Sequence, residues 1–222
     1  LTHTSGIGYG FSSQTVATLS QKTGKTELDL PLLFEPGEGW AYGASTRVLG
    51  QVVEAISGQK LDAFLEAKIL KPLGMQDTGY VVPESKTVRV VAVNQRGTDG
   101  TFTERPAGSA LAPARGAGDG GVSSKPVTIS SPVQGDGGLY STAGDYGLFL
   151  RMLLNGGKLG NARILNEKTV KTMFENHTGN VVVQPQQSTN LSLSRNFPVG
   201  AREDKWGLGF QLAKAKHPKM RK

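Results

Sequence analysis

Serine, lysine and tyrosine are the residue types in this 222-residue chain that could carry out acyl transfer, because cysteine is absent. The string from Ser57 to Lys60 has S-x-x-K spacing, in which a lysine one helical turn away takes the proton of the serine. Gly58 lies between the two residues and is suited to end a helix. We therefore expect no shared helical turn, and no catalytic role for this pair.

Other short motifs are excluded by their surroundings. Residues 22–24 spell KTG, but their polar neighbours predict a solvated turn rather than a core strand. Residues 116–121 match G-x-G-x-x-G, yet they follow a Pro-containing loop, and Pro126 stands where a dinucleotide fold requires a helix. No G-x-S-x-G string occurs, and the scattered histidines predict no protein metal site.

Composition limits the class of protein. A hydrophobic content of 37% allows one sizeable core or two small ones, and no apolar run approaches the roughly 20 residues of a membrane helix. The net charge is +7, and residues 201–222 hold seven cations against two anions. We interpret this basic end as a solvated tail, and we expect no nucleic-acid partner.

Hydrophobic periodicity predicts a helical hairpin in the first half of the chain. Ser45 or Thr46 caps a first helix, whose apolar side chains recur at helical spacing and predict one buried face: Val48, Leu49, Val52, Val53 and Ile56. Gly58 ends this helix. A second helix follows from Leu61 to Ile69, and Pro72 is predicted to stop it.

The second half of the chain reads as strands and helices around a long loop. Residues 81–94 predict one or two strands, and residues 97–135 predict a loop rich in small residues. Thr142 and Asp145 have capping-box spacing before a helix that runs to Gly156. A further helix starts near Asn166 and is predicted to bury Val170, Met173 and Phe174, while residues 206–212 alternate like a strand.

Five blocks in a fixed order give the chain a family resemblance. They are LTHTSG at 1–6, PGEGWAY at 36–42 followed by VLG at 48–50, KPLGMQDT at 71–78, GGLYSTAGDY at 137–146 and WGLGF at 206–210. In this order the blocks resemble those of the class C β-lactamase and family VIII esterase group of serine hydrolases. The resemblance implies an α+β, β-lactamase/transpeptidase-like fold, with mainly the helical domain and part of the antiparallel sheet present. Residues 1–222 would form one partial domain, truncated at both ends.

The resemblance also implies Ser–Lys–Tyr chemistry that passes through an acyl-enzyme and uses no cofactor. Tyr42 matches the tyrosine of the family's Tyr-x-Asn motif. A tyrosine is a poor base at its ordinary pKa near ~10, so the motif needs a nearby cation, which the S-x-x-K lysine supplies. That block is expected before Leu1. By analogy, Asp136 and Gly137 would approach the acyl pocket as substrate-binding residues, although a tight turn before a helix explains them equally well.

Departures from the family pattern favour an esterase. Ala44 stands where the motif has Asn, so a donor to the substrate amide is lost, and Gly43 replaces the usual Ser. The late KTG-like or HxG-like strand expected after Leu212 is absent. The predicted parent enzyme hydrolyses small-molecule esters of short-chain or aromatic acids, and the 222 residues alone are expected to be inactive.

Three alternatives stay open from the sequence. A β-lactamase or D-Ala-D-Ala peptidase would share the chemistry and act on a β-lactam or a peptide. A non-catalytic scaffold or binding protein would keep the fold without the nucleophile. Nucleic-acid binding through the basic tail is a third class. Oligomeric state and cellular compartment are left open.

Overall fold

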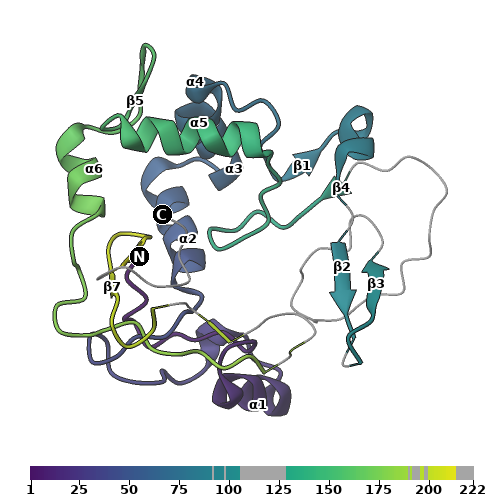
Figure 1. Cartoon of the computed structure of the whole chain (residues 1–222), viewed down its shortest axis with the longest axis vertical. Coiled ribbons are helices and arrows are strands. Elements are labelled where there is room, and N and C mark those ends of the chain that lie inside the picture. The colour runs from purple at the N-terminus through teal and green to yellow at the C-terminus, as the bar shows by residue number, and fades with distance from the viewer. Residues whose placement is uncertain are drawn as a thin grey trace.

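The computed structural model describes residues 1–91, 93–97, 99–105, 129–189, 191, 196–197 and 200–213 (Figure 1). The G-x-G-x-x-G string at 116–121 and most of the basic tail, residues 214–222, lie outside the described residues. In the part that is described, no helix is both long enough and apolar enough to cross a bilayer.

Helix α2, Ser45–Ser57, forms where periodicity predicts it and ends at Gly58 in the left-handed conformation. Its N-cap position is Ala44, without a side-chain bond, so the predicted cap is wrong. The predicted buried face is also wrong, because Leu49, Val52 and Ile56 are exposed, Ile56 at 82%.

The packed face of α2 is instead its small and polar side. Gly50 is buried and lies against the backbone of Gly135. One turn further, the Glu54 side chain accepts a hydrogen bond from the backbone N–H of Leu61 at 3.0 Å. A glycine lets two backbones approach closely. Close backbone packing and polar contacts therefore decide which side of α2 faces inward.

The second predicted helix has three parts: α3 (Leu61–Leu65), the π-helical segment η2 (Glu66–Leu70) and α4 (Lys71–Leu73). Pro72 does not stop the helix, contrary to the prediction; it lies in the first turn of α4, directly after the π-helical segment η2. Gly74, with φ +73°, ends the helix instead.

The main core forms where this helical segment meets helices α5 (Ala143–Leu154) and α6 (Glu167–Met173), and α5 runs across α3 and α4 in Figure 1. Its buried members are Leu70, Leu73, Met75, Met152, Leu153 and Val170. Val170 is buried as predicted. Phe174 is exposed, contrary to the prediction, because it follows the end of α6 and contacts one side of the Phe210 ring.

Asp145 ties the turn after α4 to the start of α5. The Thr142 hydroxyl caps α5 by accepting from the Asp145 N–H at 3.1 Å. The Asp145 carboxylate does not close the predicted capping box. It accepts instead from the Asp77 backbone N–H at 2.7 Å and from the Thr78 hydroxyl at 2.8 Å. Two of the sequence blocks therefore meet through one buried carboxylate.

The described strands pair as four short antiparallel ribbons. β1 (Val81–Val82) pairs with β4 (Ile129–Ser130), β2 (Val93–Arg96) with β3 (Phe102–Arg105), β5 (Lys158–Leu159) with β6 (Ala162–Arg163), and β7 (Lys205–Trp206) with β8 (Gln211–Leu212).

Three strand predictions need correction. Residues 81–94, predicted as one or two strands, hold β1 and the start of β2, and the 3₁₀ helix η3, Glu84–Arg89, separates them. Strands β3 and β4 lie inside the predicted loop 97–135, where β3 pairs with β2 and β4 pairs with β1. The predicted strand 206–212 is a hairpin, because Gly209 adopts φ +88° between β7 and β8.

The first thirty residues contain a helix that hydrophobic periodicity did not indicate. Helix α1, Gln14–Thr23, begins at Ser13, whose hydroxyl accepts from the Val16 N–H, and ends at Gly24 in the left-handed conformation. A short 3₁₀ turn, η1, follows at Glu27–Asp29. Only Val16 of α1 is buried. The sequence therefore marks the two ends of this helix through its capping residues, but it has almost no apolar stripe that would predict the helix between them.

Two glycines near α5 should respond to alanine in opposite directions. Gly147 lies within α5 with open space where a Cβ would go, so Gly147→Ala should raise the free energy of unfolding by about 1 kcal/mol. Gly157 has φ +89°, and its Cβ would overlap the carbonyl oxygen of Leu165, so Gly157→Ala should destabilise. Urea denaturation measures both. A neutral Gly157→Ala would contradict the described packing after α5.

Candidate active site

Tyr42 lies on a loop that the first residues of the chain hold by hydrogen bonds. The Gly37 N–H donates to the Thr4 carbonyl at 2.8 Å, and the Ala41 N–H donates to the His3 carbonyl at 3.0 Å. The first residues of the chain also contact the hairpin of β7 and β8, because the Gly209 N–H donates to the Leu1 carbonyl at 3.3 Å. The start of the chain lies beside β7 in Figure 1. Three sequence blocks thus converge at the tyrosine.

Gly43 and Ala44 fit the backbone that surrounds them. A Cβ on Gly43 would overlap the Ile7 carbonyl oxygen and come within 2.9 Å of the Gly8 Cα. The serine usual in the family motif therefore has no room in this backbone. Ala44 is fully buried and presents no polar side-chain group to a ligand. Both departures from the motif are accommodated by close packing around the tyrosine.

His3 is a buried residue that contacts the loop of Tyr42 through its side chain as well as through its backbone. It is only 6% exposed, and its Nδ1 accepts the Gly43 N–H at 3.3 Å. Its ring lies 4.6 Å from the Tyr42 ring and 5.3 Å from the Trp206 ring, measured between centroids. Burial, with a smaller effect of the positive amino terminus, lowers the pKa of His3 to about 4. His3 is therefore neutral at pH 7 and serves as an acceptor.

The Tyr42 side chain is half-buried among aromatic rings. Its ring centroid lies 5.6 Å from that of Tyr9 and 5.4 Å from that of Phe197, the latter edge to face. No residue in the described ranges hydrogen-bonds to its hydroxyl, whereas its backbone carbonyl accepts from Ser12 at 3.3 Å. The ring is thus fixed by packing, and its oxygen is not used by the described structure.

Tyr9 differs from Tyr42 in that its hydroxyl is engaged by a carboxylate. The Tyr9 hydroxyl donates to Asp136 Oδ2 at 2.7 Å. Burial, followed by the hydrogen bond and negative charge of Asp136, raises the pKa of Tyr9 far above its ordinary value. Tyr9 therefore stays protonated as a donor. Of these two neighbouring tyrosines, only Tyr9 has a hydroxyl that is hydrogen-bonded to another described residue.

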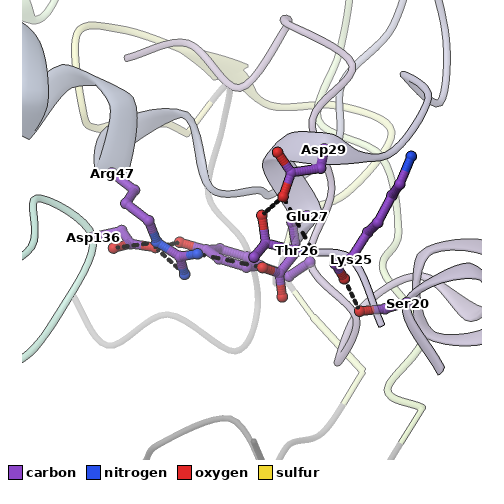
Figure 2. A network of polar contacts seen from close by, with 8 residues as sticks. Ser20, Lys25, Thr26, Glu27, Asp29, Arg47 and Asp136 are labelled. Atoms are coloured by element: carbon purple, nitrogen blue, oxygen red, sulfur yellow. Dashed lines mark hydrogen bonds and ion pairs between the residues drawn. The ribbon is translucent and has the colours of Figure 1, made fainter. Parts of the chain in front are cut away.

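Asp136 is engaged inside the protein, as Figure 2 shows for its contact with Arg47. Arg47 reaches the carboxylate through Nε, at 3.0 Å from Oδ2, and through a terminal nitrogen at 2.9 Å. The other terminal nitrogen of Arg47 lies 3.3 Å from Glu27 Oε2. Burial alone lowers the pKa of Arg47, but the two carboxylates and the hydrogen bond to Asp136 outweigh it and raise that pKa.

Gly137 sits in a tight turn beside this network. The turn carries an isolated bridge between Gln134 and Gly137, and Gly138 follows with φ +98°. Gly137 itself is exposed, while the Asp136 side chain is only 3% exposed. Since Tyr9 contacts both Asp136 and the Tyr42 ring, the fold places the 136–137 turn one aromatic ring away from Tyr42.

The two misleading sequence strings lie apart from any such arrangement. Ser57 is the last residue of α2, and the left-handed Gly58 turns the chain before Lys60. The Lys60 side chain is 83% exposed and lies 3.9 Å from Glu54. Ser57 and Lys60 therefore share no helical turn, as expected. Residues 22–24 form the exposed end of α1.

A shallow cavity of about 560 Å³ lies elsewhere on the helical part. Its lining comes from residues 62–81 and Leu139, with Asp62, Glu66 and Lys71 as its charged groups. Lys71 is paired with Glu66 at 3.0 Å. Neither Tyr42 nor the 136–137 turn borders this cavity, so we do not place the chemistry there.

Three residues at the site were missed by the sequence reasoning: His3, Tyr9 and Arg47. His3 belongs to a recognised block, and its burial in that block could have been suspected. Arg47 and Asp136 are 89 positions apart, and no local pattern links them. Within the described ranges, no group of three His, Cys, Asp or Glu side chains is placed to hold a metal ion.

Comparison with known proteins identifies the family. The Beta-lactamase family profile matches residues 1–220, so the chain belongs to the Beta-lactamase family. Protein Rv1367c of Mycobacterium tuberculosis is 31% identical over 228 residues, covering 98% of this chain and 51% of that protein. The lovastatin esterase of Penicillium rubens is 29% identical, covering 95% of this chain and 52% of that protein. The chain thus spans about half the length of the curated relatives it matches.

Solved structures agree on the fold. EstCE1, described as a hydrolase with promiscuous acyltransferase activity, superimposes with a TM-score of 0.64 at 20% identity, covering 97% of this chain and 55% of its own. The chain has the α+β, β-lactamase/transpeptidase-like fold, with helices and small antiparallel ribbons, as the resemblance implied. The relatives that the chain matches include a lovastatin esterase, and the family model it matches is that of the β-lactamases.

His3 should make the stability of the chain depend on pH. Its pKa is about 4 when folded and ordinarily about 6.5, so the unfolded state binds more protons between these values. The stabilisation is complete above pH 6.5 and is lost as the pH falls toward 4, by up to about 3 kcal/mol.

Urea denaturation from pH 7.5 to 4 on the wild type and on His3→Gln checks this expectation. The difference between the two unfolding free energies isolates the contribution of His3, because all the other titratable groups are present in both proteins and their effects cancel. His177→Gln, at an exposed position, is the matched control. A difference that stays constant with pH would contradict the neutral, buried state of His3.

Proposed function

We propose that the protein hydrolyses carboxylic esters of short-chain or aromatic acids through an acyl-enzyme, with Tyr42 in the proton relay. The observation that carries the proposal is the phenolic oxygen of Tyr42. Its ring is fixed among His3, Tyr9 and Phe197, and yet no described residue hydrogen-bonds to its hydroxyl. A relay needs a group that is held in place but whose oxygen is left for the reacting partners.

The nucleophile and its lysine would come from outside these 222 residues. The described S-x-x-K string is split by Gly58, and the chain spans about half the length of its relatives, which leaves room for the pair elsewhere in the whole protein. The serine would attack the ester carbonyl, and its proton would pass to the Lys–Tyr pair. The same groups would return a proton to the leaving alcohol.

Close packing around the tyrosine favours an ester over an amide-containing β-lactam. The fully buried Ala44 provides no donor where the family motif has an Asn side chain. An active site built without a donor gains nothing from a substrate amide, whereas an ester presents no such group. The name of the lovastatin esterase, at 29% identity, supports the same choice of substrate class.

The 136–137 turn would border the acyl pocket. Tyr9 bridges the turn and the Tyr42 ring, so a substrate placed at Tyr42 would lie near it. Because the Asp136 carboxylate is occupied by Tyr9 and Arg47, the turn would contribute its backbone and the exposed Gly137 rather than a charge.

Steady-state hydrolysis by the complete protein tests the proposal. We expect turnover of p-nitrophenyl butyrate to exceed that of nitrocefin, and Tyr42→Phe to lower kcat by about 100- to 10,000-fold. Tyr146→Phe, on the exposed part of α5, is the matched control and should leave kcat unchanged.

The outcomes separate the competing functions. Nitrocefin as the better substrate would replace the esterase with a β-lactamase. A Tyr42→Phe protein with wild-type kcat would remove Tyr42 from the mechanism. Turnover of neither compound by the complete protein would favour a non-catalytic member of the fold.

A further inference from the structure

We infer that Arg47 and Asp136, acting through Tyr9, form a positioning clamp that sets the orientation of the Tyr42 ring. The clamp comprises Tyr9, Glu27, Arg47 and Asp136. The inference rests on the proposed function only for the meaning of Tyr42 as a relay group. The clamp itself is defined by contacts within the chain, and it can be tested without any activity.

The contacts of the clamp have the geometry of strong, charge-assisted bonds. Arg47 Nε donates to both oxygens of Asp136, at 3.2 Å to Oδ1 and 3.0 Å to Oδ2, and a terminal nitrogen of Arg47 forms an ion pair with Oδ2 at 2.9 Å. The same oxygen accepts the Tyr9 hydroxyl at 2.7 Å. This two-point contact, through two nitrogens of one guanidinium, is charge-assisted and therefore stronger than a neutral hydrogen bond. Asp136 is therefore held in one orientation, and so is the phenol that donates to it.

Burial makes this arrangement hard to distort. The Asp136 and Glu27 side chains are almost fully removed from solvent, and Arg47 lies between them with most of its side chain covered. Removing one partner from such a pair leaves an uncompensated buried charge, which is strongly unfavourable. Figure 2 shows Arg47 extending from α2 between Asp136 on one side and Glu27 on the other.

The clamp reaches Tyr42 by two routes. Through space, the Tyr9 ring lies 5.6 Å from the Tyr42 ring and stacks on Phe11 at 4.9 Å. Through the chain, Arg47 lies in the first turn of α2, five residues after Tyr42. A shift of the clamp therefore moves a ring that contacts Tyr42 and also the helix that follows it.

These roles differ from substrate binding. The Asp136 carboxylate is engaged by Arg47 and Tyr9, and its side chain is only 3% exposed, so it is not presented to a ligand. We assign Asp136 and Arg47 as positioning residues. Tyr9 connects them to Tyr42, because it contacts both Asp136 and the Tyr42 ring. Misplacement of a reacting group by about 1 Å can cost about 100-fold in rate, so such residues can control turnover without touching substrate.

Fluorine NMR on the 222-residue chain tests the clamp directly. The chain has five tyrosines, and 3-fluorotyrosine labelling gives one resonance for each, assigned by single Tyr→Phe variants. Tyr9→Phe removes only the hydroxyl, Asp136→Asn removes the charge, and Arg47→Lys keeps the charge but loses the two-point contact. Lys86→Met is the matched control, because it breaks the ion pair to Asp77 at 2.5 Å away from the clamp.

We expect the Tyr42 resonance to shift or broaden in Tyr9→Phe and Asp136→Asn, and to change less in Arg47→Lys. The Tyr146 resonance on α5 should stay in place in all three, which separates a local change from unfolding. Lys86→Met should leave Tyr42 unchanged. If Asp136→Asn collapses every resonance, Tyr9→Phe decides. An unchanged Tyr42 resonance in Tyr9→Phe would overturn the inference.

Kinetics on the complete protein add a second readout. Asp136→Asn and Tyr9→Phe should lower kcat by at least 10-fold and leave KM within about threefold, because orientation rather than substrate affinity is lost. A rise in KM with unchanged kcat would instead assign Asp136 to substrate binding. If the complete protein proves inactive, the NMR result still stands, so the clamp and the proposed function can fail separately.

Discussion

The close contact between the first eight residues and the loop of Tyr42 is the constraint on which the rest of the site depends. His3 supplies both a carbonyl to Ala41 and a ring nitrogen to Gly43, and the Ile7 carbonyl fills the place of a Gly43 side chain. With no side chain at 43, the two backbones can meet, and the Tyr42 ring is directed among its aromatic neighbours. The position of the Tyr42 ring therefore depends first on contacts between two backbone segments, and only then on the side chains around it.

Much of the helical framework could be predicted from local signals. Helices α2 and α5 form where the local signals predict them, and Gly58 ends α2 as expected. The error at the buried face of α2 arises because packing is decided by distant partners. The inward face of α2 is its glycine side, because Gly50 meets Gly135, and periodicity sees only the apolar residues. Helix α1 was not predicted because it has capping residues at both ends but no row of apolar residues at helical spacing.

The candidate site was predictable in part, through the order of its sequence blocks rather than through any spacing. Family resemblance pointed to Tyr42 and to the 136–137 turn, and the fold brings both to the same region. It could not show that the Asp136 carboxylate is consumed by Arg47 and Tyr9, since these partners are far away in sequence. A buried ion pair between remote residues leaves no mark in a single sequence. The role of a residue such as Asp136 can therefore be assigned only when its contacts in the fold are known, in addition to the sequence block in which it lies.

The central proposal is that the Tyr42 oxygen faces a nucleophilic serine in the complete protein. A crystal structure of the complete protein, inhibited with a p-nitrophenyl alkylphosphonate that traps the serine covalently, tests it most directly. We predict that the Tyr42 oxygen lies within hydrogen-bond reach, about 2.6–3.2 Å, of the oxygen of the trapped serine. A Tyr42 ring turned away from the phosphonylated serine, with another side chain in its place, would contradict the account.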